Sequence, residues 1–113
     1  MEIQYSEMDN GIRLIILNGR LDIVGTGKIG SKFAAYCAGD NVRLVVELSE
    51  VDFLASIGIH LLMHTAKSVA SRGGRMVLLN PVPDIQSVLE VAGITAIIPI
   101  YSSLESAEAI LMA

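Results

Sequence analysis

The stretch that decides the fold is VRLVVELSEVDFLASIG, residues 42–58. Its first part, residues 42–48, is rich in β-branched side chains and has consecutive apolar residues at positions 44–46. Apolar residues without alternation are typical of a strand buried on both faces, as in a largely parallel sheet. The apolar remainder, residues 51–58, is interpreted as a loop that leads into a helix.

Downstream of this stretch the apolar residues take the period of a helix. They recur three or four apart and predict one buried face, made of Ile59, Leu62, Ala66 and Val69. Polar residues share the opposite face, namely His60, His64, Lys67 and Ser71. Gly73 and Gly74 are expected to end this helix.

Two further pairs of strand and helix complete the downstream half. Residues 76–79 predict a short strand, and a helix opened by prolines follows it. Residues 97–101 predict the last strand, where Pro99 has no amide hydrogen, so either the strand lies at an edge or its proline faces away from the neighbouring strand. Ser102 and Glu105 have the spacing of a capping box and predict a terminal helix.

Upstream of residues 42–58 the chain begins with a predicted β-hairpin. Residues 2–8 alternate in part between apolar and polar side chains, and residues 12–17 form a longer strand pattern. The Asn-Gly pair between them tolerates the positive φ angles of a tight turn. Helical spacing follows at Ile29 and Phe33, although nearby glycines weaken the start of that helix.

The predicted order of elements is therefore β-β-α-β-α-β-α-β-α. Repeated strand-helix-strand crossovers require parallel neighbours, and the hairpin adds one antiparallel strand. We expect an α/β fold in a single domain over residues 1–113, with a mixed, mostly parallel sheet, an N-terminal hairpin and about four helices.

Composition limits the class of partner. The chain has 113 residues, 52% of them hydrophobic, and a net charge of −4 with eight scattered Lys and Arg. A nucleic-acid surface needs a basic stripe or a set of aromatic stacking platforms, and two Phe, three Tyr and no Trp supply few of these. We expect a protein partner and no nucleic acid.

The sequence favours the cytoplasm. Its longest apolar runs fall far short of the roughly 20 residues that a membrane helix needs, so no direct membrane insertion is expected. The amino-terminal residues show no pattern of an export signal. The single cysteine, Cys37, has apolar neighbours and is expected to be a buried, inert thiol, as suits a reducing compartment.

A glycine-rich segment raises the question of a nucleotide site. Residues 25–30, GTGKIG, match G-x-G-x-x-G, and Glu47 follows them in the sequence. A dinucleotide site needs a strand that runs straight into the first glycine, whereas Asn18 and Gly19 interrupt it. The Walker pattern fails because Lys28 is not followed by Ser or Thr. We expect a flexible loop and a weak first helical turn without a cofactor, and nucleotide binding or hydrolysis remains a third hypothesis.

Two arrangements of potentially catalytic side chains are incomplete. His60 and His64 lie four apart on the polar helix face, which is half of a metal site, and no third ligand is visible. Ser56 and Gly58 match the second half of the nucleophile elbow Gly-x-Ser-x-Gly, but position 54 is Leu. We expect no metal and assign no catalytic residue.

Ser56 is the hydroxyl of most interest in the chain. A Ser directly before a helix is the preferred N-cap, because its oxygen accepts hydrogen bonds from first-turn amides. That role does not account for the apolar residues around it. A partly buried loop would leave Ser56 and Ile57 near an exposed tip, and an apolar tip with one hydroxyl suggests a docking surface.

At this loop the chain resembles the STAS domain and, within that superfamily, the bacterial anti-sigma-factor antagonists. The resemblance covers almost the whole chain, and its specificity lies in the order and spacing of several pieces. The matching stretches are residues 17–22, LNGRLD; residues 45–51, VVELSEV; residues 73–81, GGRMVLLNP; Val88-Leu89 with Ala92-Gly93-Ile94; and Ile100-Tyr101-Ser102-Ser103 with Glu105 and Ala107.

The family's usual loop is Asp-Ser-Ser/Thr-Gly, and its first Ser accepts phosphate from a partner that is both anti-sigma factor and serine kinase, of the GHKL type. The resemblance therefore implies that Ser56 is the phosphoacceptor. Asp22 matches the family's acidic residue before the first helix. The implied partner-binding set is Asp22, Ala55, Ile57, Gly58 and Leu61.

The resemblance implies a non-enzymatic anti-sigma-factor antagonist. Such a module sequesters the kinase while Ser56 is unphosphorylated, releases it when Ser56 is phosphorylated, and is reset by a serine phosphatase. Ala55 and Ile57 stand where the family has Asp and Ser/Thr. These departures favour an alternative, in which the chain is an unmodified STAS scaffold subunit of a signalling assembly or a membrane transporter.

Overall fold

The computed structural model describes residues 1–113 and contains one five-stranded sheet in the order β1-β2-β3-β4-β5. The first two strands, β1 (Glu2–Glu7) and β2 (Arg13–Leu21), form the predicted antiparallel hairpin. The next three, β3 (Arg43–Leu54), β4 (Arg75–Leu79) and β5 (Ile100–Tyr101), continue the sheet as parallel neighbours. The predicted mixed, mostly parallel sheet with an N-terminal hairpin is therefore confirmed.

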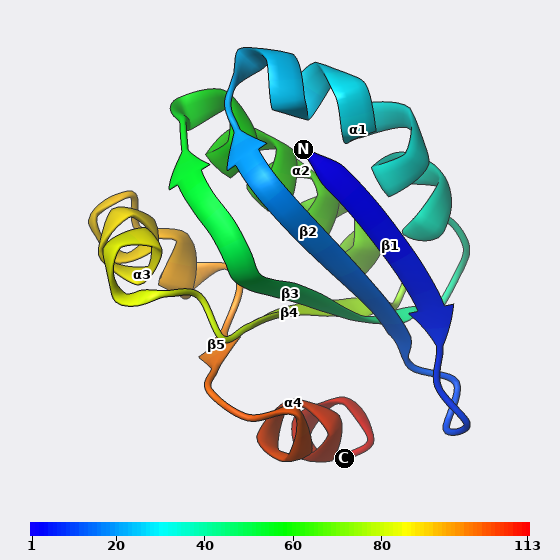
Figure 1. Ribbon diagram of the computed structural model, residues 1–113. Coiled ribbons are helices and arrows are strands. Elements are labelled where there is room, and N and C mark those ends of the chain that lie inside the picture. Colours follow the sequence, from blue (N-terminus) through cyan, green and yellow to red (C-terminus); the bar gives the residue numbers. More distant parts are fainter.

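Four α-helices and one short 3-10 helix connect these strands. They are α1 (Ile23–Tyr36), α2 (Ser56–Ser71), α3 (Pro83–Val91), the 3-10 helix η1 (Ile94–Ala96) and α4 (Leu104–Leu111). In Figure 1, α2 lies behind β1 and β2, α1 lies above these strands and to their right, and α4 lies apart from both helices, below the sheet. Side chains of α1, α2 and α3 share the larger hydrophobic core, whereas α4 packs in a separate, smaller one.

β3 is buried on both faces, as its sequence predicts. Leu44 and Val46 are fully buried in the larger core. Val45, between them, is fully buried in the smaller core, together with Ala107 and Leu111 of α4. Each apolar residue of this run therefore packs against helices, on one face of the sheet or the other.

The predicted loop at residues 51–58 is wrong, because strand and helix meet almost directly. β3 continues to Leu54, α2 begins at Ser56, and only Ala55 lies between them. The strand persists because it stays paired with β2 as far as Leu21, which lies opposite Leu54. Val51 and Leu54 are buried, so part of the segment follows the expected buried path.

The predicted interruption at Asn18 and Gly19 is also wrong. β2 runs through both residues to Leu21, and shifts in its pairing with β3 on either side of them absorb the irregularity. α1 then begins at Ile23, so residues 25–30 lie inside a helix: the predicted helical turn is confirmed and the predicted flexible loop is wrong. Because β2 leads almost directly into α1, this segment forms a helix despite its glycines.

The carboxyl-terminal elements differ from prediction in their bounds. Residues 94–96 form the 3-10 helix, so β5 is reduced to Ile100–Tyr101, although it does take the expected edge position. Ser103, and not Ser102, caps α4, because Ser103 is the extended residue and its Oγ accepts from Ser106 N at 3.2 Å. The capping box predicted with Glu105 is therefore wrong by one residue.

Candidate docking site at the carboxyl ends of β2 and β3

The parallel pairing of β2 and β3 brings the two predicted site segments to one edge of the sheet. Ala55 N donates to Leu21 O at 3.0 Å, which joins the start of α2 to the end of β2. A Cβ on Gly58 would lie 2.7 Å from Leu21 Cγ. Gly58 therefore lets α2 pack closely against the end of β2. In the sequence, Asp22 directly follows Leu21, and Ser56 directly follows Ala55.

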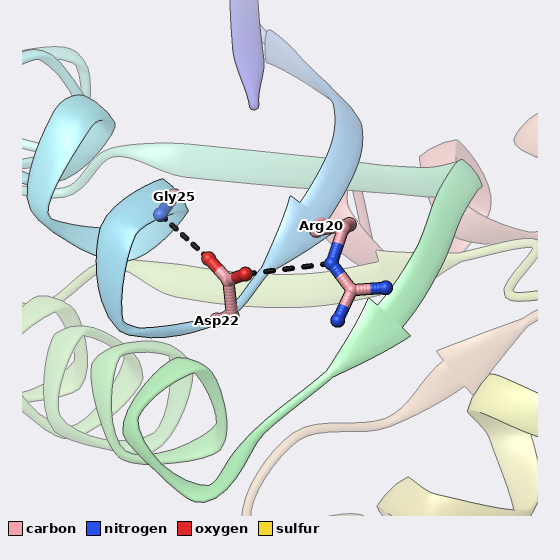
Figure 2. Close-up of polar contacts among 3 residues, drawn as sticks. All are labelled: Arg20, Asp22 and Gly25. Atoms are coloured by element: carbon pink, nitrogen blue, oxygen red, sulfur yellow. Dashed lines mark hydrogen bonds and ion pairs between the residues drawn. The ribbon is translucent and has the colours of Figure 1, made fainter.

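Asp22 is the N-cap of α1. Its Oδ1 accepts from Gly25 N at 2.7 Å, and its Oδ2 lies 3.4 Å from Arg20 Nε (Figure 2). The amide of Gly25 first, and the guanidinium of Arg20 second, hold the pKa of the Asp22 carboxyl below its ordinary value. This predicted docking residue therefore also stabilises the start of a helix.

Arg20 connects this cap to the end of β3. Its guanidinium carbon lies 4.1 Å from the centroid of the Phe53 ring, in a cation–π contact. The same guanidinium forms the ion pair with Asp22. Arg20 thus joins the start of α1 and the end of β3, and it leaves Phe53 40% exposed.

Ser56 is not an N-cap, contrary to the prediction. Ala55 takes that position, with φ −94° and ψ 167°, and its carbonyl accepts from the amides of Gly58 and Ile59. Ser56 is instead the first residue of α2 and is exposed. Because no side chain caps α2 and Gly58 N is already bonded to Ala55 O, the N–H groups of Ser56 and Ile57 are the two that stay open to an outside acceptor.

Four exposed apolar side chains surround these helix starts. We call them the apolar rim, and its members are Ile23 at 73% exposure, Val24 at 69%, Phe53 at 40% and Ile57 at 41%. Ile57 was predicted, and Phe53 was noted as part of an apolar segment. Ile23 and Val24 were missed, although two β-branched residues directly after an acidic N-cap are a usable signal.

The other predicted residues take plainer positions. Leu61 is half-buried and packs against the larger core. His60 and His64 are exposed on the polar face of α2, and no three His, Cys, Asp or Glu residues come together as metal ligands. Cys37 is buried, as predicted, and this burial raises the pKa of its thiol to about 12.

The glycines of residues 25–30 serve helix packing. A Cβ on Gly25 would collide with the backbone oxygen of Arg20, so only glycine lets α1 begin this close to β2. Gly27, in contrast, has open space around it. The match to G-x-G-x-x-G thus has a packing explanation at its first glycine.

None of the helices is both long and apolar enough to span a membrane.

The hairpin, the parallel strands and the alternating helices define an α/β domain whose exposed site is a pair of helix starts. The family model of the STAS domain matches residues 6–107, and the chain belongs to this family. The resemblance found in the sequence is therefore confirmed.

Relatives of the chain carry names that agree with the resemblance. It is 26% identical over 109 residues to BtrV of Bordetella bronchiseptica, named as a candidate anti-sigma factor antagonist, covering 96% of this chain and 93% of that protein. A solved anti-sigma factor antagonist from Mycobacterium paratuberculosis has a TM-score of 0.88 at 22% identity, over 99% of this chain and 94% of that one.

The fold is also shared with SpoIIAA, an anti-sigma factor antagonist. Its unphosphorylated form has a TM-score of 0.78 at 20% identity, over 99% of this chain and 98% of that one. The phosphorylated form of the Bacillus protein has a TM-score of 0.70 at 20% identity, over 96% and 99% of the two chains.

Proposed function

We propose that this protein is an anti-sigma factor antagonist whose binding is controlled by phosphorylation of Ser56. Residues 1–113 act as a single STAS domain in the cytoplasm. The unphosphorylated form sequesters a partner that combines anti-sigma factor and GHKL-type serine kinase, and the phosphorylated form releases it. A serine phosphatase restores the first form, so the catalysis belongs to the partners.

The observation that carries this proposal is the state of the Ser56 hydroxyl. It stands exposed at the first position of α2, where it makes no capping hydrogen bond. A kinase can reach it without opening the fold. A hydroxyl committed to capping would have to give up that bond before phosphorylation.

The helix start can accept a phosphate. A phosphoserine adds a charge of about −1.5 to −2. The first turn of α2 has no acidic residue, so the positive end of the helix dipole and the open N–H groups favour that charge. The fold is therefore expected to survive modification.

Phosphorylation of Ser56 is expected to change the docking surface more than it changes the fold. Ile57 lies next to Ser56 and is 41% exposed, so a partner that covers Ile57 would have to desolvate a phosphate beside it. Losing one buried anchor costs about 2 kcal/mol, or roughly thirtyfold in affinity. A change of that size is sufficient to exchange partners.

The proposed docking set is Asp22, Ala55, Ile57, Gly58 and Leu61. Its members have different parts in the structure: Asp22 holds α1, Gly58 lets α2 pack against Leu21, and Ile57 presents apolar surface. Ala55 and Leu61 are less exposed, being half-buried. We therefore assign most of the partner contact to the apolar rim, of which Ile57 is a member.

A second candidate function is that of an unmodified scaffold subunit. The observation that favours it is the replacement of the family's Asp and Ser/Thr by Ala55 and Ile57, which removes two polar side chains beside Ser56. A scaffold would keep its partners whether or not position 56 carries negative charge.

Affinity capture from the native cytoplasm separates the two functions. The baits are the wild type, Ser56→Asp and, as a matched control, Ser31→Asp, which places the same charge at an exposed position within α1. We expect the wild type and the control to retain a kinase-fold protein that Ser56→Asp loses. If all three baits retain the same proteins and Ser56 carries no phosphate, the scaffold function replaces the switch.

A further inference from the structure

A free sheet edge lies at the amino-terminal strand. β1 is the first strand in the sheet order and pairs only with β2, so its outer side has no neighbouring strand. Five of its six residues are exposed. An uncovered edge strand presents unpaired N–H and C=O groups, which can pair with another extended chain.

Two lysines of α1 border this edge. Lys28 and Lys32 line a groove of about 430 Å³ with Ile29 and with residues 1–4, which include the first half of β1 and one acidic residue, Glu2. Both lysines are exposed. The structure contains a single ion pair, between Arg20 and Asp22, so neither ammonium group has an acidic partner.

Two arginines near the other end of α1 are already engaged within the fold. Arg13 donates to the carbonyls of Tyr36 and Ala38, and Arg72 donates to those of Cys37 and Gly39. These four carbonyls lie at and just beyond the end of α1. Lys28 and Lys32 differ from the two arginines in that their charges remain available to a partner.

The spacing of the lysines suits an extended acidic segment. Residues four apart on a helix are separated by about 6 Å along its axis. Alternate residues of a strand are separated by about 7 Å and point to the same face. Two carboxylates at alternate positions of an added strand therefore match the ammonium groups of Lys28 and Lys32.

We propose that the outer edge of β1, with Lys28 and Lys32, binds an extended acidic segment of a partner protein as an added strand. Backbone hydrogen bonds to β1 supply the pairing, and the two lysines select for acidic side chains. A second copy of this chain fits less well, because Glu2 and Glu7 are the only acidic residues of β1 and, being five apart, point to opposite faces of the strand, so they cannot both meet the two lysines.

This inference is independent of the proposed function, because it uses neither Ser56 nor the apolar rim. The test uses a blocked peptide of alternating valine and glutamate, VEVEVEV, and the matched peptide VKVKVKV. Titration into the isotope-labelled protein is followed by backbone amide chemical shifts and by hydrogen exchange of the β1 amides. The variant is Lys28→Glu with Lys32→Glu, and the control is Lys67→Glu, an exposed lysine of α2.

We expect the acidic peptide to shift the β1 amides and to slow exchange at alternate positions along the strand. Its affinity should fall at least tenfold in the double variant and should not change in Lys67→Glu. The proposal is overturned if the acidic peptide leaves β1 unperturbed at millimolar concentration, if VKVKVKV binds equally well, or if the β1 amides gain no protection. In those cases the lysines only guard the edge against pairing.

Discussion

α1 and α2 begin next to each other at one edge of the sheet, yet their first turns are built differently. Asp22 caps α1, is paired with Arg20, and is followed by Gly25, which is packed tightly against β2. α2 has Ala55 at its N-cap and no side-chain cap, and it begins with the exposed Ser56. We call the start of α1 the closed start, because a side chain caps it. We call the start of α2 the open start, because no side chain caps it.

The two helix starts are therefore expected to have different roles, the start of α1 in stability and the start of α2 in binding. Groups that satisfy each other within the fold, such as Asp22 and Gly25, contribute to stability. Groups left unsatisfied at the surface, such as the amides of Ser56 and Ile57 at the start of α2, are available to a phosphate or a partner. Substitutions at the closed start should change stability, and substitutions at the open start should change binding.

The largest effect on stability is expected at Gly25. Gly25→Ala should lower the free energy of unfolding by about 3 kcal/mol or more, because the new methyl group collides with the backbone of Arg20. Gly27→Ala, two residues further along α1 in open space, should raise it by roughly 0.5–1 kcal/mol. Chemical denaturation of both variants checks this, and equal effects would contradict the tight packing of the closed start.

Replacing Thr26, near the start of α1, is expected to increase stability. Its Oγ1 is buried without a hydrogen-bond partner, and the residue is only 8% exposed. Thr26→Val keeps the shape and should raise the free energy of unfolding by about 1 kcal/mol, because an unsatisfied hydroxyl is removed. Thr65→Val, at a half-buried position of α2, is the control and should change it by less. A thermal melt in which Thr26→Val is destabilised would show that the hydroxyl has a partner.

Asp22 should contribute stability in a pH-dependent way. Its folded-state pKa lies below the ordinary value of 3.8, so the contribution of its charge is complete above that value. It is lost as the pH falls through the lower, folded-state pKa. Asp22→Asn keeps a capping oxygen without the charge, so wild type and variant should differ at neutral pH and converge in acid. A difference that grows in acid would contradict the proposed cap and ion pair.

The smallest effect on stability is expected at the open helix start. Ser56→Asp should leave the free energy of unfolding unchanged or raise it by a few tenths of a kcal/mol, because a negative charge suits the start of α2. Ser56→Ala should change it little, because no capping bond is lost. Denaturation midpoints check both variants. A loss above about 1 kcal/mol in Ser56→Ala would show that this hydroxyl caps the helix after all.

The sequence was sufficient for the elements whose burial depends on local pattern. The consecutive apolar, largely β-branched residues at 44–46 are typical of a strand covered on both faces, and the structure covers them on both faces. The Asn-Gly pair likewise located the hairpin, although the turn is not the predicted tight one: the connection spans residues 8–12, and of the pair only Gly11 has a positive φ. In these cases the side chains themselves determine the secondary structure and its burial.

The bounds at the site could not be predicted, because contacts between distant segments set them. The bond from Ala55 to Leu21 O, and the pairing of Leu54 with Leu21, extend β3 and move the N-cap one residue before Ser56. Gly25 lowers the helix propensity of its segment, yet close packing on Arg20 requires glycine there. A local pattern contains neither contact.

The measurement that tests the central claim most directly compares the two forms of Ser56 in binding to the captured kinase partner. The partner, ATP and Mg²⁺ are used to phosphorylate the protein, mass spectrometry locates the phosphate, and calorimetry in the presence of ADP gives the affinity of each repurified form. The account predicts a single phosphate on Ser56 and an affinity roughly thirtyfold weaker for the phosphorylated form. Equal affinities, or phosphate on a different residue, would contradict it.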